Sequence, residues 1–188
     1  MHRLSSSFIL GYHGCRRVVG ETLVNGTPFR KSENEWDWLG PGAYFWEANP
    51  QRALDWATQQ YGAPDAFVVG AIVEPGLCLD LTTTSGLAAV RQAYDRLVET
   101  MDLAGTALPG NTGATDDKVV RKLDCAVIRM LHEMNSASGR PQVDTVKGVF
   151  TEDAPLYPGS GFRALTHIQH AVCNLDCIKG VFRVPYTA

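Results

Sequence analysis

The stretch Leu39-Gly40-Pro41-Gly42-Ala43-Tyr44-Phe45-Trp46-Glu47 places a Gly-Pro-Gly segment one residue before three consecutive aromatic residues. Glycine has no Cβ atom, so a ligand can approach its backbone closely and positive φ angles become accessible. An ordinary strand gains nothing from Gly-Pro-Gly. The sequence therefore predicts a turn and an aromatic strand that together contact a ligand.

A second informative stretch, Gly11-Tyr12-His13-Gly14-Cys15, lies upstream of the first. The loose alternation of Phe8–His13 predicts a strand that ends at Gly14. His13 offers one ring donor or acceptor, and Gly14 offers an unobstructed backbone amide. Together the two stretches carry groups suited to a planar ligand with hydrogen-bonding edges, such as nicotinamide.

The bulk composition predicts one soluble globular domain spanning residues 1–188. Hydrophobic residues make up 45% of the chain and charged residues 20%, which is ordinary for such a domain. The net charge of −3 argues against a phosphate-binding surface over the whole molecule, although a local basic groove is compatible with it. No apolar run approaches the roughly 20 residues needed to cross a bilayer, so we expect no membrane partner.

Cysteine usage predicts a reducing compartment. The five cysteines are scattered, with no Cys-x-x-Cys motif, which argues against a zinc site and a disulfide framework. They are Cys15, Cys78, Cys125, Cys173 and Cys177. Free thiols in the cytoplasm are the simplest interpretation. The short polar segment Met1–Ser7 is a poor secretory signal.

The first half of the chain shows clear local signals. Arg30–Trp38 is polar and is expected to loop over the ligand. Asn49-Pro50 is typical of an N-cap followed by proline at the first helical position. Phe67–Val73 predicts a strand, and Leu77–Leu81 a second short strand after the Pro75-Gly76 turn.

The second half predicts two longer helices followed by strands. Apolar residues repeat at helical spacing from Leu87 to Met101 after Thr84-Ser85, and from Val120 to Met134 after Asp116-Asp117. Ala104–Thr115 between them is expected to be a loop. Strands are predicted over Gly148–Thr151, His167–Cys173 and Ile178–Val184. Strands at both ends and helices in the middle indicate an α+β fold with a split antiparallel sheet, in which the first strand neighbours a late one.

The two opening stretches resemble the first two motifs of the ADP-ribosyltransferase superfamily, most closely its poly(ADP-ribose) polymerase-like branch. In that branch the motifs are roughly His-Gly-Ser/Thr and Gly-x-Gly-x-Tyr-Phe, against His13-Gly14-Cys15 and Gly40-Pro41-Gly42-Ala43-Tyr44-Phe45 here. The resemblance implies two packed antiparallel sheets with inserted helices and an NAD⁺ cleft between the sheets. It implies NAD⁺ as a substrate and requires no metal.

The resemblance assigns the first motif to NAD⁺ binding. It implies that His13 bonds the adenosine-side ribose and that the Gly14 backbone bonds the nicotinamide amide. The structural alternative for His13 is a histidine at the end of a strand whose ring is hydrogen-bonded to a neighbouring carbonyl. Arg16 and Arg17 follow directly, and a guanidinium matches phosphate oxygens, so Arg16 is a candidate for the pyrophosphate, although surface arginines are usually only solvated.

The second motif implies an aromatic platform. Tyr44 would stack on nicotinamide, which leaves as a neutral ring while positive charge develops on the ribose. The alternative is an ordinary strand aromatic. Trp56 falls near the position of a second stacking aromatic, with a one-residue offset, and is equally compatible with the core. Where the family has a serine that bonds the amide, Arg52 or Ala53 stands instead.

The third motif carries the chemistry in the family, through a glutamate at the start of a late strand. Gln169 aligns with that glutamate; it keeps a carbonyl acceptor but lacks the negative charge. Glu47 or Glu152 is a candidate for the missing carboxylate, and each is equally compatible with a solvated strand-end acid. The resemblance implies transfer of a single ADP-ribose, because chain building in the family depends on the glutamate.

The sequence thus predicts a mono-ADP-ribosyltransferase acting on a macromolecular acceptor, protein or nucleic acid, as a toxin or a regulatory modifier. The loop Tyr157–Phe162 is expected to border the acceptor side. Three alternatives are a non-catalytic NAD⁺ or ADP-ribose sensor, a cysteine hydrolase with Cys15 as nucleophile, and an RNA 2′-phosphotransferase. The hydrolase would take His13, His132, His167 or His170 as its base.

Overall fold

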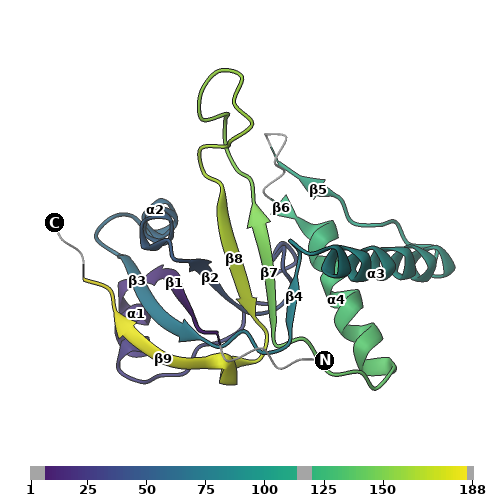
Figure 1. The fold of residues 1–188 in the computed structure, drawn as a ribbon, viewed down its shortest axis with the longest axis horizontal. Coiled ribbons are helices and arrows are strands. Elements are labelled where there is room, and N and C mark those ends of the chain that lie inside the picture. The colour runs from purple at the N-terminus through teal and green to yellow at the C-terminus, as the bar shows by residue number, and fades with distance from the viewer. Residues whose placement is uncertain (1–6, 114–119, 186–188) are drawn as a thin grey trace.

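In the computed structural model, which describes residues 7–113 and 120–185, seven strands form one sheet. Their order across the sheet is β4-β7-β8-β2-β1-β3-β9 (Figure 1). The strands are β1 Ile9–Arg16, β2 Ala43–Glu47, β3 Ala66–Val73, β4 Cys78–Asp80, β7 Thr145–Phe150, β8 His167–Val172 and β9 Ile178–Arg183. Along the chain, helices stand between strands of this sheet, so the predicted α+β class is confirmed.

Strand pairing differs from the sequence-based expectation in two ways. The strands join one hydrogen-bonded sheet, and β4 and β7 run parallel, so the sheet is mixed rather than purely antiparallel. The first strand lies between β2 and β3, so the prediction that it neighbours a late strand is wrong. The late strands β8 and β9 pair instead with β2 and β3. Strand patterns specify which face is buried but not which strand is the partner.

The ladder between β1 and β2 is short, and this shapes the whole molecule. These strands pair only at Gly11↔Glu47 and Tyr12↔Trp46, whereas β1 pairs with β3 along its full length, from Ile9↔Val73 to Arg16↔Ala66. Beyond Tyr12, β1 and β2 therefore diverge. In Figure 1, β7 and β8 stand upright while β3 and β9 sweep across the lower left.

Four α-helices are described: α1 Arg17–Val24, α2 Pro50–Tyr61, α3 Thr84–Leu103 and α4 Lys122–Ala137, with a 3₁₀ turn at Leu175–Cys177. The predicted start of α2 is confirmed, because Asn49 Oδ1 accepts a hydrogen bond from Arg52 N–H at 3.0 Å. Thr83 caps α3, one residue before the predicted Thr84-Ser85. The expected cap of α4, Asp116-Asp117, lies outside the described residues.

Some element boundaries also differ from prediction. β1 continues to Arg16, beyond the predicted end at Gly14, because Cys15 and Arg16 keep their pairing with β3. The predicted loop Ala104–Thr115 contains a short strand, β5 Asn111–Thr112, which pairs with β6 Val120–Arg121. Helix α1 was not expected, since only two of its eight residues are buried and its periodicity is too short to detect.

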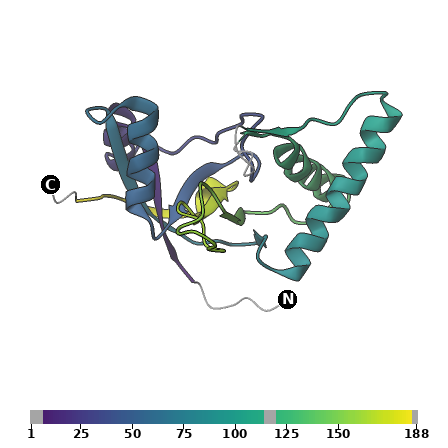
Figure 2. The ribbon, with the colours of Figure 1, turned by 90° about the horizontal axis from the view of Figure 1, so that it is seen from above.

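The core divides between the two ends of the sheet. Figure 2 shows α1 and α2 at one end of the molecule and α3 and α4 at the other. Leu97, Leu131 and Val146 belong to the core beneath α3 and α4, and Phe45 and Val69 belong to the core of the other end. None of the helices in the described residues is both long enough and apolar enough to cross a bilayer.

Candidate functional site

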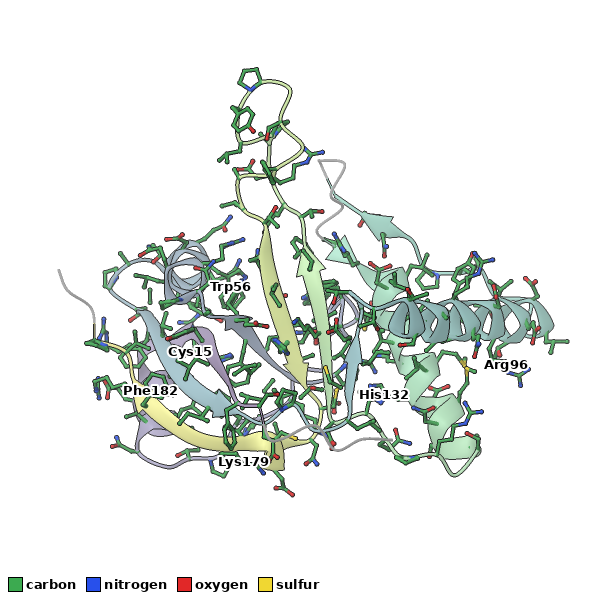
Figure 3. The ribbon with its side chains drawn as sticks, viewed as in Figure 1. Cys15, Trp56, Arg96, His132, Lys179 and Phe182 are labelled. Carbon is green, nitrogen blue, oxygen red and sulfur yellow. The ribbon has the colours of Figure 1, made fainter. Side chains whose placement is uncertain are left out.

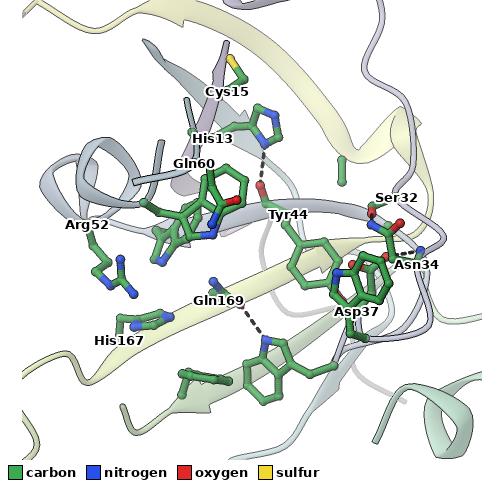
Figure 4. Close-up of a pocket in the computed structure, with 18 of the residues that line it drawn as sticks. His13, Cys15, Ser32, Asn34, Asp37, Tyr44, Arg52, Gln60, His167 and Gln169 are labelled. Carbon is green, nitrogen blue, oxygen red and sulfur yellow. Dashed lines mark hydrogen bonds between the residues drawn. The ribbon is translucent and has the colours of Figure 1, made fainter. Parts of the chain in front are cut away.

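A cavity of about 620 Å³ opens where β1 and β2 diverge (Figure 4). The ends of β1, β2, β7 and β8, the loop before β2, and helix α2 all contribute to its wall. All four tryptophans of the chain line it: Trp36, Trp38, Trp46 and Trp56. Such a density of flat rings suits a planar ligand.

The residues that the sequence singled out come together in this cavity. His13, Gly14, Arg16, Tyr44, Trp56 and Gln169 all line it. The Arg30–Trp38 loop, expected to lie over a ligand, lines it through Arg30, Ser32, Asn34, Trp36, Asp37 and Trp38. The structure thus juxtaposes all three sequence motifs, whatever their chemical roles.

Gly14 presents its main chain to the cavity. Ala48 N–H donates to the Leu10 carbonyl at 2.9 Å, so the backbone of Leu10 faces β2. In a strand alternate residues face the same edge, so Tyr12 and Gly14 face β2 as well. The β1–β2 ladder ends at Tyr12, and we call the gap between the two strands beyond that point the notch. The Gly14 N–H and C=O face this notch without a partner from β2. A side chain here is excluded, since a Cβ atom would lie 2.4 Å from the Ala53 carbonyl oxygen.

His13 is anchored by one ring nitrogen and available through the other. Its Nδ1 lies 2.9 Å from the Tyr44 carbonyl oxygen, which can only accept, so Nδ1 carries the proton. Burial lowers the pKa of His13 below its usual value, and this hydrogen bond only partly opposes the effect. The neutral ring therefore leaves Nε2 as an acceptor. The carbonyl contact expected for a strand-end histidine is confirmed, and His13 also lines the cavity, where its contact with a ribose stays a prediction.

Tyr44 contributes a ring rather than an ionisable group. Its hydroxyl accepts from Leu39 N–H at 3.0 Å and donates to the Gly40 carbonyl at 2.8 Å. Burial is the main cause that raises the pKa of Tyr44 far above its usual value. The phenol is therefore neutral and fixed within its own loop, and Gly40 allows the tight turn with a φ of +77°.

Gln169 is oriented by Trp38. The Trp38 indole Nε1 donates to Gln169 Oε1 at 2.7 Å. An indole N–H can only donate, which fixes the amide with its oxygen toward Trp38 and its NH₂ away from it (Figure 4). The carbonyl that the sequence suggested as a ligand acceptor is thus engaged. Gln169 offers hydrogen-bond donors instead.

Trp56 and Arg16 both contact Tyr61, the last residue of α2. The Trp56 ring lies 5.6 Å from that of Trp46 and also packs against a small apolar cluster, so it is both cavity wall and core. The Arg16 guanidinium lies 4.9 Å from the ring centroid of Tyr61. Arg17 does not line the cavity; it donates to the carbonyls of Pro64 and Ala66.

Only one of the two candidate carboxylates lines the cavity. Glu152 lines the cavity, where its Oε2 accepts from Arg52 Nη2 at 2.7 Å. Glu47 does not line it; its Oε2 lies 2.6 Å from His170 Nε2 and 3.8 Å from Lys147 Nζ. Glu152 is therefore the one of the two positioned to meet a ligand in the cavity.

Cys15 has the wrong environment for a nucleophile. Cys15 lies just before α1, a helix that the sequence did not reveal, and the backbone of Gly20 in that helix acts to lower the pKa of the thiol. Burial nevertheless dominates and raises the pKa of Cys15 to about 11, which keeps the thiol protonated. His132, one of the candidate bases, lies in the opposite half of the molecule (Figure 3). The buried, protonated thiol therefore disfavours the hydrolase alternative.

Sequence reasoning did not assign Trp46 to the site, and it expected Trp38 only as part of the loop over the ligand. Trp46 follows Tyr44 by two residues and therefore shares its face of the strand, which is a detectable signal. In the sheet it lies directly opposite Gln169. Trp38 carried no comparable signal, because its contact with Gln169 spans 131 residues of sequence.

Comparison with known proteins gives no indication of what this cavity does. No family model, curated protein or solved structure matches the chain. The chemistry of the site must therefore be argued from the groups that line the cavity. Those groups are a free backbone amide, a neutral histidine acceptor, oriented amide donors and stacked aromatic rings.

Proposed function

We propose that the protein is a mono-ADP-ribosyltransferase that moves ADP-ribose from NAD⁺ to a macromolecular acceptor and releases nicotinamide. The carrying observation is the notch between β1 and β2, which gathers His13, Gly14, Tyr44 and Gln169 around one cavity. These are the residues that the family resemblance selects from three distant segments. We place the reaction in the cytoplasm, where NAD⁺ is available and free thiols such as these five persist.

The cavity residues account for the recognition of NAD⁺ in this proposal. The Gly14 N–H and C=O complement the two halves of the nicotinamide carboxamide. His13 Nε2 accepts a hydrogen bond from a ribose hydroxyl, because the ring is neutral and Nδ1 is already used. Tyr44 and Trp56 supply ring faces for stacking, and Arg16 supplies a cation for the pyrophosphate.

The transfer step needs only these groups and an acceptor. The bond between ribose C1′ and the nicotinamide nitrogen breaks, and its electron pair neutralises the pyridinium ring. The acceptor nucleophile forms the new bond to C1′ and loses a proton to a base. The Gln169 NH₂ donates to a ribose hydroxyl oxygen and orients the sugar, while Trp38 holds that amide in place.

A sensor is the second candidate, and the Trp38–Gln169 hydrogen bond favours it. A neutral donor at this position gives the developing positive charge on the ribose no electrostatic stabilisation. A sensor would bind NAD⁺ or ADP-ribose through the same wall of the cavity. The two candidates differ in one observable, the release of nicotinamide.

The deciding experiment follows label from adenylate-labelled NAD⁺ into a whole-cell lysate while nicotinamide release is measured chromatographically. We expect label and nicotinamide with the native protein and neither with Tyr44→Ala or Gln169→Ala. Leu103→Ala is the matched control, because that side chain is 88% exposed at the end of α3. Thermal protection by NAD⁺ without label or nicotinamide would establish the sensor. Neither protection nor label would refute both.

A further inference from the structure

Three buried polar atoms with no hydrogen-bond partner among the described residues belong to side chains that line the same cavity. They are Trp46 Nε1, Arg52 Nε and His167 Nε2. Arg52 is only 9% exposed and His167 only 6%. Buried polar groups in folded proteins are almost always hydrogen-bonded, so these atoms mark a place where a bound molecule would find hydrogen-bond partners. Figure 4 shows Arg52 and His167 beside each other at one end of the cavity.

The hydrogen-bonding pattern of this end is mixed. His167 Nδ1 lies 2.7 Å from the Leu165 carbonyl oxygen and so carries the proton, which makes Nε2 an acceptor. Trp46 Nε1 and Arg52 Nε are donors. Glu152 adds carboxylate oxygens, one of them already held by Arg52. A phosphate or carboxylate would face two acceptors here. A neutral group with both carbonyl oxygens and N–H is complementary.

Aromatic rings make the same end of the cavity flat. The His167 ring stacks on Phe150 with centroids 5.4 Å apart and planes 27° apart. The Trp46 ring lies 6.2 Å from that of His167. These rings contact one another and present flat apolar surface to the cavity, against which a planar ligand packs well. A ring whose edge alternates carbonyl oxygen and N–H, the lactam edge of guanine, thymine or uracil, satisfies both the shape and the hydrogen bonds.

A long loop that begins at this end of the cavity projects into solvent. Residues 151–166 join β7 to β8 and project from the sheet at the top of Figure 1. Glu152 and Leu165 are linked at the base of the loop by a hydrogen bond of 3.2 Å. Tyr157 and Phe162 near its tip are 54% and 68% exposed. Exposed aromatic rings stack on unpaired bases without sequence preference.

We propose that the cavity end formed by Trp46, Arg52, Glu152 and His167 is the acceptor subsite, and that it takes a lactam-edged nucleobase of a nucleotide or single-stranded nucleic acid. This inference rests on the proposed function. A base nitrogen bonds to C1′ as the C1′–nicotinamide bond breaks, nicotinamide keeps that electron pair, and the N–H proton passes to Glu152. Arg52 holds Glu152 in position through their 2.7 Å contact.

The first test is binding rather than catalysis. All four tryptophans line the cavity, so their fluorescence reports its occupancy. We expect guanosine, thymidine and uridine monophosphates to quench it, with at least tenfold weaker binding in His167→Phe, which keeps the ring but lacks the acceptor. Leu103→Ala, at a side chain that is 88% exposed, should leave this binding unchanged. Circular dichroism confirms folding of each variant, and Arg52→Lys provides a second subsite variant.

The second test distinguishes the source of the base. Tyr157→Ala combined with Phe162→Ala should weaken the binding of single-stranded oligonucleotides and leave nucleotide binding intact; equal loss of both would contradict the role of the loop. Label that resists nuclease and yields to protease would overturn the proposal in favour of a protein acceptor. So would NAD⁺ quenching and nicotinamide release without quenching by any nucleotide. Failure of NAD⁺ itself to bind would instead refute the proposed function.

Discussion

Gln169 accepts a hydrogen bond from the Trp38 indole at 2.7 Å, and this single contact sets what the third motif offers to a ligand. The Gln169 NH₂ is left to donate to a ligand, and Gln169 itself carries no charge. At the scale of single residues, the cavity is therefore built for orientation more than for electrostatic stabilisation. Substitutions that change charge without changing shape test this directly.

Gln169→Glu should accelerate nicotinamide release. One carboxylate oxygen can accept from Trp38 Nε1 as the amide does, and the other would place a negative charge in the cavity. We expect a rise of about tenfold, equivalent to about 1.4 kcal/mol of transition-state stabilisation. Chromatographic assay of nicotinamide measures it, with Gln169→Leu as the uncharged control. Unchanged or slower release at equal NAD⁺ affinity would contradict the proposed role.

Tyr44→Phe should destabilise the fold while preserving NAD⁺ binding. The lost hydroxyl leaves the N–H of Leu39, a fully buried residue, without its acceptor, which typically costs about 1–3 kcal/mol. The stacking ring remains. Urea unfolding measures the first effect and thermal protection by NAD⁺ the second. Tyr157→Phe, at an exposed position, is the control. Loss of NAD⁺ protection would show that the hydroxyl itself contacts the ligand.

At the scale of elements, helix α2 packs closely on strand β1, and both contribute residues to the cavity wall. The Gly14 backbone lies so near to Ala53 that no side chain fits between the strand and the helix. Helix α2 in turn carries Arg52 and Trp56 into the cavity. The position of these side chains therefore depends on one glycine in the neighbouring strand.

Gly14→Ala should move α2 and weaken the site. The added Cβ would lie 2.4 Å from the Ala53 carbonyl oxygen, and pairing to β3 along its full length prevents β1 from yielding. Overpacking of this kind costs about 1–3 kcal/mol of folding free energy. We expect lower stability in urea and loss of NAD⁺ protection. Gly110→Ala, with no atom within 4 Å of the added Cβ, should behave as the native protein; an equal effect there would point to a nonspecific cause.

At the scale of the whole molecule, buried neutral histidines link stability to pH. Burial lowers the pKa of His13, His132, His167 and His170 below the usual value. Above about pH 6.5 the folded and unfolded states are both neutral at these residues. As the pH falls below that value, the unfolded chain takes up protons that the folded chain resists. The free energy of unfolding therefore decreases on acidification.

Urea unfolding at pH 7.5 and pH 5.5 checks this expectation. The decrease in the free energy of unfolding can reach about 1.4 kcal/mol per pH unit for each histidine that protonates only in the unfolded chain. His170→Phe should flatten the dependence, because that side chain is 1% exposed and its burial, which lowers the pKa, outweighs the opposing contact with Glu47. Stability that is equal at the two pH values would show that the histidines protonate in the folded protein.

Much of the local structure follows from the amino-acid sequence. The start of α2 at Asn49-Pro50, the strand Phe67–Val73 and helix α3 were all predicted from caps, prolines and hydrophobic periodicity. These signals act between residues within a few positions of one another, where the chain itself keeps the partners close. The candidate residues His13, Gly14 and Tyr44 were found for the same reason, since each belongs to a short motif.

Tertiary structure alone settled the sheet order, the notch and the chemistry of its two ends. Hydrophobic patterns do not choose strand partners, so the short ladder between β1 and β2 could not be foreseen. The contacts that orient the site join distant residues: Trp38 and Gln169 are 131 positions apart, and Arg52 and Glu152 are 100. The atoms left unpaired at Trp46, Arg52 and His167 became visible only once folding had buried them beside one another, because burial, not sequence, removes their water.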